Sequence, residues 1–273
     1  MIPITEINAA ADKYGVPGET IEKDYVISWI LFCLSKSQLK NNFIFYGGTA
    51  IKRMYFEEHR YSEDIDLISS GRFRQEYLLK ELEVLQKARE EANLNLAIDL
   101  DGITVEKDRI QLFVKYSGYD EIGGVPKEVR LDFTMDRSLD GEIADKKIIE
   151  SYSDLRTITE TLSVMTLNTI LANKLGMLTE ITRNEPRDLF DIWFLLERTN
   201  QFDFSFDQVC KIFKNKYGFS PTLNILKPRL LNNSFKVNWD MRLKKQIAKL
   251  PSVEVVIKSV GKKLDELFGE SKQ

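Results

Sequence analysis

A strand, a glycine pair, a helix and a second strand follow one another early in this sequence, and this order constrains the fold most strongly. The apolar run FIFY (43–46) is followed directly by Gly47 and Gly48. The segment TAIKRMYFEE (49–58) then has apolar residues at helical spacing, and DIDLIS (64–69) alternates as a strand with one polar face does. Glycines at the end of a strand let the backbone turn or approach a partner closely. The pattern predicts a chain of mixed helices and strands with a tight connection at the glycine pair.

The rest of the chain divides into a strand-containing portion and a helical portion. By the same criteria, helices are predicted at residues 5–14, 17–42 and 73–93, and strands at 94–99, 109–116 and 128–135. The pairs Asp101-Gly102 and Gly123-Gly124 suit hairpin turns between these strands. After Ser153 the strand signal fades, and TLSVMTLNTILANKLGMLTEI (161–181) and the segment that begins at Pro186 are predicted as helices.

These elements predict an α/β (α+β) fold. A mixed sheet flanked by helices is expected in residues 1–155, followed by a C-terminal helical portion in residues 156–273. We expect the first portion to carry catalysis, and the second to contribute side chains to the cleft and a basic surface.

The composition excludes several kinds of site. Of the 273 residues, 43% are hydrophobic and 30% are charged, which is ordinary for a globular protein. One histidine, His59, and two cysteines are too few for a multi-histidine zinc site or a disulfide framework. No apolar run has the length of a membrane span, and the first residues lack the order of a signal peptide. We therefore expect a cytoplasmic protein without a membrane partner.

The charge is distributed unevenly along the chain. Residues 201–273 contain 14 lysines and arginines against 7 aspartates and glutamates, although the whole chain has a formal net charge of −3. An acidic body with a basic C-terminal portion fits a catalytic domain joined to a surface that binds a polyanion. Lysine-rich solvated helix faces explain the same numbers equally well.

The motif DxD in the second strand indicates a metal site. Asp64 and Asp66 are two residues apart, so both carboxylates lie on one face of the strand. Adjacent carboxylates repel one another unless a cation lies between them, and Mg²⁺ prefers oxygen ligands together with substrate phosphates. Upstream, Gly47, Gly48 and Thr49 open a helix whose backbone N–H groups and hydroxyl can meet a phosphate. The combination indicates phosphoryl or nucleotidyl transfer with a two-metal site.

Asp132 is the expected third carboxylate of this site. In EVRLDFT it shares one strand face with Arg130, while apolar residues form the other face. A buried acid needs a partner or a metal, so we interpret Asp132 as a metal ligand or general base. An ion pair with Arg130 or a nearby lysine is the alternative. Asp99 and Asp101 compete for the role, but they adjoin a glycine-containing turn and resemble turn residues.

A second polar group occurs in the helical portion. Lys174 lies within a long apolar helix, and Arg187, Asp188 and Asp191 cluster at the start of the next one. The i,i+3 spacing places the two aspartates on one face. A snorkelling lysine and acids that interact with the helix dipole are the simpler explanations. Beside a nucleotide site, these side chains become candidates for contacts to the triphosphate, ribose or base.

Three stretches resemble the abortive-infection AbiE-type nucleotidyltransferase toxins of the polymerase-β-like superfamily. They are YGGTAIKRMYFEEHRYSEDIDL (46–67), EKDYVISWIL (22–31) and NKLGMLTEITRNEPRDLFDIWFLL (173–196). The resemblance implies a magnesium-dependent nucleotidyltransferase fold and a bacterial toxin with a separate antitoxin protein. It also implies tRNA as the acceptor in some members.

The resemblance also assigns roles to residues of this chain. Asp64 and Asp66 would bind metal, and Lys174 with Asp191 or Asp188 would form the later motif. Gly48 and Thr49 would contact phosphate. The full nucleotide-binding set that we predict is Gly47, Gly48, Thr49, Lys52, Ser62, Arg187 and Asp188. The segment Ile51-Lys52-Arg53 departs from the family by being more basic than the usual small or aliphatic residues.

Taken together, the sequence predicts a Mg²⁺-dependent enzyme that transfers NMP from an NTP to an RNA, preferably a tRNA end, and releases pyrophosphate. Two alternatives stay open. The acceptor is a protein hydroxyl, or the chain is a nucleotide-binding regulatory module without turnover. The DxD pair argues against the module, because a pure binder has little need of two adjacent metal ligands.

Overall fold

The computed structural model describes residues 1–119, 127–136, 141–157 and 159–270. The chain forms two compact units. The first contains Met1–Leu139 and Ile143–Val164, and the second contains Asp140–Glu142 and Met165–Gln273. In the part of the chain that is described, no helix is long and apolar enough to cross a membrane.

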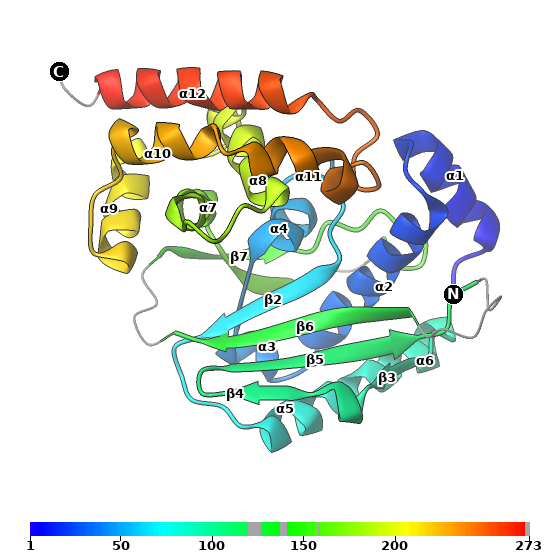
Figure 1. Cartoon of the computed structure of the whole chain (residues 1–273). Helices are drawn as coiled ribbons and strands as arrows, with labels where there is room; N and C mark the ends of the chain where they lie inside the picture. Colours follow the sequence, from blue (N-terminus) through cyan, green and yellow to red (C-terminus); the bar gives the residue numbers. More distant parts are fainter. Residues whose placement is uncertain (120–126, 137–140, 158, 271–273) are drawn as a thin grey trace. The chain divides into compact units, whose positions relative to one another are not determined.

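The first unit is built on one mixed β-sheet with the order β3-β5-β6-β2-β1-β8-β7, and β4 pairs with β5 outside this path. The strands are β1 (Ile44–Tyr46), β2 (Asp64–Ser69), β3 (Leu96–Ile98), β4 (Thr104–Glu106), β5 (Arg109–Tyr116), β6 (Lys127–Met135), β7 (Ile143–Lys147) and β8 (Thr161–Met165). Strand β2 runs parallel to β6 and antiparallel to β1 (Figure 1). The expected mixed sheet is confirmed.

The alternation in β2 and β6 gives the sheet one apolar and one polar face. Val129, Leu131 and Phe133 of β6 are completely buried, and Phe133 packs edge-on against Phe43 and Phe73. On the other face, the parallel register pairs Asp64 with Arg130 and Asp66 with Asp132. The register therefore brings three carboxylates onto neighbouring positions of two central strands.

The helices of the first unit are α1 (Ile4–Tyr14), α2 (Gly18–Ser35), α3 (Leu39–Asn42), α5 (Gln75–Glu81) and α6 (Gln86–Ala92), with a 3₁₀ turn, η2 (Leu82–Leu85), between the last two. Helices α2 and α6 pack against the sheet at β6 and β3, and α1 and α3 pack against α2. Helix α2 crosses behind β5 and β6 (Figure 1) and is buried almost all round, as a helix with apolar residues on every side must be. After β1 the chain forms one α-turn, α4 (Gly47–Ala50), and then a π-turn, η1 (Ile51–Tyr55).

The second unit is helical. It contains α7 (Leu167–Thr179), α8 (Pro186–Leu196), α9 (Phe206–Tyr217), α10 (Leu223–Leu230), α11 (Asn233–Leu243) and α12 (Val253–Glu270), with a 3₁₀ turn, η4 (Thr199–Gln201), after α8. Helices α8, α9 and α10 pack against α7, which is buried along most of its length. Gly176 of α7 is required by this packing, because a Cβ there would lie 2.0 Å from the ring of Tyr217 on α9. As expected, Pro186 begins a helix.

The sequence expectation was wrong for two segments. Residues 161–165 form strand β8 rather than the start of a helix, because Leu162 and Val164 are buried on one side and the hydroxyl of Thr166 caps α7 at the backbone N–H of Thr169. Strand β7 was not predicted. The helical expectation for 49–58 holds only as far as the π-turn ends.

The turns differ as well. Asp101 and Gly102 lie in a 3₁₀ turn, η3 (Leu100–Gly102), between two strands that both pair with β5, so they form no hairpin. The hairpin turn is the pair Lys107 and Asp108, which joins β4 to β5. Gly123 and Gly124 lie outside the described residues.

Candidate active site

The predicted metal carboxylates lie together on the polar face of the first unit. Asp66 and Asp132 are directly opposite each other on the parallel strands β2 and β6, and Asp64 lies on the same face of β2. Asp64 and Asp66 are half-buried, whereas Asp132 is only 4% exposed. Sequence alternation therefore predicted the face correctly, and the sheet register brings the third carboxylate beside the first two.

Two of these carboxylates form ion pairs with arginines. The Nε of Arg109 on β5 donates to Oδ1 of Asp132 at 2.7 Å, and a second nitrogen of the same guanidinium contacts Oδ2. Arg130 donates to Oδ2 of Asp64 at 2.6 Å. An ion pair of Asp132 with Arg130 was the alternative considered from the sequence, but the structure pairs Asp132 with Arg109.

Gly47 and Asp66 approach each other closely. Gly47 has a φ of +84°, and a Cβ at this position would lie 2.6 Å from Oδ2 of Asp66. Burial and the charge of Asp66 raise the pKa of the hydroxyl of Tyr46, which lies opposite Asp66 on β1. Two features therefore favour glycine at position 47. The backbone has a conformation that residues with side chains rarely adopt, and a carboxylate lies against the Cα.

Thr49 connects the helix start to the DxD strand. Its buried hydroxyl donates to the main-chain carbonyl of Asp64. Ser62 lies half-buried in the loop that leads into β2. Thr49 therefore contacts the strand of the predicted metal carboxylates and Ser62 precedes it by two residues, and their part in phosphate binding stays a prediction.

Lys52 is buried within the π-turn. Its ammonium group donates to the carbonyls of Glu57 at 2.8 Å and His59 at 3.1 Å, and it lies 3.8 Å from the ring centroid of Tyr61. Burial lowers the pKa of Lys52 to about 8. Lys52 also lines a pocket of about 420 Å³ together with Asp24 and Tyr61, so it is reachable from that side, and its contact with a nucleotide stays a prediction.

The donor set fits a hard divalent cation by its chemistry. Three carboxylates meet on adjacent strands, and the space above Gly47 that a Cβ would fill lies against Asp66. Within the described ranges, no group of three or more His, Cys, Asp or Glu side chains is already arranged to hold a metal ion. The side chains of Asp64 and Asp132 are instead engaged by arginines.

The second polar group forms a buried ion cluster in the second unit. Lys174 lies 2.6 Å from Oδ1 of Asp188 and 2.8 Å from Oδ2 of Asp191, and Arg183 contacts Oδ2 of Asp188 at 2.8 Å. Although burial opposes it, the charges of Lys174 and Arg183 lower the pKa of Asp188. Lys174 is therefore held by two carboxylates and does not extend to solvent as a snorkelling lysine would.

Arg183 was not named among the predicted site residues, although it lies within the 173–196 stretch that carries the family resemblance. Arg187 was predicted from the sequence. Its side chain contacts Glu185 at 3.1 Å, and the side chain of Glu185 caps helix α8. A role for this cluster or for Arg187 in nucleotide binding stays a prediction.

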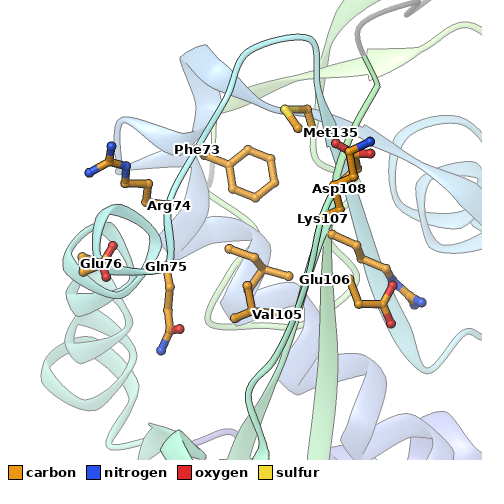
Figure 2. Close-up of a pocket in the computed structure, with 11 residues that line it drawn as sticks. Phe73, Arg74, Gln75, Glu76, Val105, Glu106, Lys107, Asp108 and Met135 are labelled. Carbon is orange, nitrogen blue, oxygen red and sulfur yellow. The ribbon is translucent and has the colours of Figure 1, made fainter.

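A pocket of about 330 Å³ lies beside the β4–β5 hairpin on the first unit. Figure 2 shows Phe73, Val105 and Met135 around its interior and the charged residues Glu106, Lys107 and Asp108 along the hairpin. Arg109, the partner of Asp132, is also a lining residue. The pocket thus shares one side chain with the carboxylate site.

Solved structures of other proteins share this fold. MenT4, a nucleotidyltransferase toxin from Mycobacterium tuberculosis H37Rv, matches with a TM-score of 0.69 at 15% identity over 98% of this chain and 90% of that one. JHP933 from Helicobacter pylori matches with a TM-score of 0.61 at 17% identity over 94% of this chain and 95% of that one. At such identities the likeness shows the fold. No curated protein matches the chain in sequence.

A family model identifies the chain more directly. The model of the nucleotidyl transferase AbiEii toxins of type IV toxin–antitoxin systems matches residues 29–268. This match covers both units and includes the glycine pair, the DxD strand, Asp132 and the Lys174 cluster. It confirms the family expected from the sequence, and it makes the protein an enzyme rather than a regulatory module. The chain therefore belongs to the AbiEii family of nucleotidyltransferase toxins of type IV toxin–antitoxin systems.

Proposed function

We propose that the protein transfers a nucleoside monophosphate from an NTP to an RNA acceptor, with Mg²⁺ as cofactor and a tRNA end as the preferred acceptor. It would act in the cytoplasm and be counteracted by a separate antitoxin protein. The observation that carries the proposal is the set of three carboxylates that β2 and β6 present on one sheet face. Nucleotidyl transfer needs positioning and charge stabilisation more than covalent chemistry, and such a set is suited to both.

Asp64, Asp66 and Asp132 would hold the metal. When bound, Mg²⁺ would neutralise phosphate charge as the bond to the leaving group breaks. Gly48 leaves room for a phosphate close to the backbone, because no side chain projects there, while Gly47 leaves room for the carboxylate of Asp66. Asp132 keeps two possible roles, third metal ligand or acceptor of the proton from the attacking hydroxyl.

The preference for RNA over a protein acceptor rests on the basic C-terminal portion. Arg242, Lys244 and Lys245 are exposed at and after the end of α11. Exposed cations attract a phosphate backbone, and acceptor hydroxyls on proteins offer no comparable charge. The protein hydroxyl remains the second candidate acceptor.

The experiment incubates the full chain and Asp66→Asn with each radiolabelled NTP, Mg²⁺, total RNA and a protein lysate. We expect label in the RNA fraction with the native chain, with tRNA carrying most of it, and a loss of at least a hundredfold with Asp66→Asn. Label in protein would establish the second candidate. Full transfer by Asp66→Asn would exclude this carboxylate site. Melting curves of both chains show whether the variant is folded.

A further inference from the structure

The guanidinium of Arg109 donates hydrogen bonds to both carboxylate oxygens of Asp132. The carboxylate is nearly buried, whereas the arginine side chain is 40% exposed. The guanidinium thus reaches the carboxylate from the accessible side. This is the side from which a ligand would also arrive.

Arg130 makes a similar contact with Asp64, which lies two residues before Asp66 on the same face of β2. It donates to Asp64 at 2.6 Å from the directly opposite position on β6. Its Nε is buried and has no hydrogen-bond partner within the described residues. A buried donor without a partner is costly, so this arginine has an unused N–H group next to the predicted metal ligands.

A guanidinium binds two oxygens of a phosphate with the same forked geometry that it uses to bind the two oxygens of a carboxylate. A divalent cation competes with it for the carboxylate, because both are positive and need the same oxygens. Arg109 also has an alternative partner: Glu106 lies directly opposite it across the hairpin, and both line the pocket of Figure 2. Arg109 can therefore leave its carboxylate without losing every favourable contact, and Arg130 has an N–H group free to bind an incoming phosphate.

We propose that Arg109 and Arg130 are positioning residues that hold Asp132 and Asp64 until metal and triphosphate arrive together. Each guanidinium then exchanges its carboxylate for a phosphate of the nucleotide. Paired carboxylates bind a free metal ion weakly, and a triphosphate raises the metal affinity by drawing the arginines away. By linkage, the metal raises the affinity for the triphosphate by the same factor. This inference rests on the proposed function of the same carboxylates.

The test measures Mn²⁺ binding to the full chain by calorimetry, with and without inorganic tripolyphosphate, which avoids the question of the base. Without tripolyphosphate, Arg109→Gln and Arg130→Gln should each bind Mn²⁺ about tenfold tighter than the native chain, since a competing positive charge has been removed. The increase in Mn²⁺ affinity that tripolyphosphate produces should be smaller in both variants. Arg109→Lys, which keeps the charge, should lie between the native chain and Arg109→Gln.

Lys115→Gln is the matched control, because Lys115 also lies on β5 but pairs with Asp99 at 2.8 Å. It should bind Mn²⁺ as the native chain does. A merely structural role for the arginines predicts weaker Mn²⁺ binding, and either weaker or unchanged binding would overturn the proposal. If Arg109→Gln does not fold, Arg130→Gln decides alone. Failure of the site itself is distinguishable, because then Asp66→Asn would bind Mn²⁺ as well as the native chain.

Discussion

The carboxylate of Asp66 lies against the Cα of Gly47, so close that a methyl group at position 47 would come within 2.6 Å of Oδ2. The turn after β1 and the DxD strand are therefore fitted to each other. Gly47→Ala should lower the free energy of unfolding by about 1–3 kcal/mol, from strain at a positive φ together with the displaced carboxylate. Transfer activity should fall as well, and denaturant titration with a transfer assay checks both.

Gly261→Ala is the control for Gly47→Ala, because a Cβ at position 261 meets nothing within 4 Å. Gly261 lies inside α12, where alanine should stabilise by up to about 1 kcal/mol. Equal effects of the two changes would contradict this account of Gly47.

The ammonium group of Lys174 contacts two buried carboxylates at once. Lys174→Met should lower the free energy of unfolding by about 3–5 kcal/mol, because both carboxylates would stay buried without this cation, and Arg183 contacts only Asp188. Lys227→Met removes an exposed ion pair with Asp265 and should change stability by less than about 1 kcal/mol. Urea unfolding of both variants provides the comparison. A small effect at Lys174 would mean that the carboxylates find other cations or become protonated.

The buried ammonium of Lys52 makes stability depend on pH. Burial lowers the pKa of Lys52 from 10.5 to about 8 in the folded chain. Between these two values the unfolded chain binds a proton that the folded chain lacks, so this residue makes unfolding harder as pH rises. The native chain should gain roughly 1–3 kcal/mol relative to Lys52→Met between pH 7 and pH 10. Denaturation curves of both chains at several pH values measure this difference. A constant difference would show that Lys52 keeps its ordinary pKa.

The basic residues at and after the end of α11 should control RNA affinity. Replacing Arg242, Lys244 and Lys245 with alanine should weaken RNA binding and reduce the slope of log affinity against log salt by about 2–3. Each phosphate contact releases counterions on binding, so each contact that is removed takes about 1 off the slope. NTP binding should be unchanged.

The control for this surface replaces Lys262 and Lys263 on α12, which both lie near Glu266. The two lysines share one carboxylate, and Arg242 likewise lies 3.5 Å from Glu185, so the control differs from the triple variant in its position on α12. Loss of these two lysines should alter the salt slope by less than about 1. Equal slopes for the native chain and the triple variant would leave the basic residues as an ordinary solvated surface.

Sequence alone predicted the site's strands because their information is local. Alternation in 64–69 and 128–135 identifies which side chains share a face, and the structure agrees for Asp66 and Asp132. Which arginine pairs with Asp132 depends on the register of β5 against β6, and that is a tertiary property. The position of a strand and the face on which a side chain lies can thus be predicted from the sequence, whereas the ion-pair partner of that side chain cannot.

Strand β8 was missed for a different reason. Its five residues lead into α7 without glycine or proline, so the apolar run looks continuous with the helix. Thr166 was a readable cap signal three residues before Thr169. The π-turn that buries Lys52 has no sequence signature that period analysis detects, because one five-residue turn does not establish a period.

The parallel pairing of β2 with β6 also bears on when the protein becomes harmful to its host. The two strands are separated by a long stretch of chain that includes α5, α6 and three other strands. Such distant pairings form slowly, after the local helices and hairpins. A ribosome-bound chain that has not yet extruded residue 132 cannot bring the three carboxylates together, so the proposed metal site is incomplete until that residue has left the ribosome.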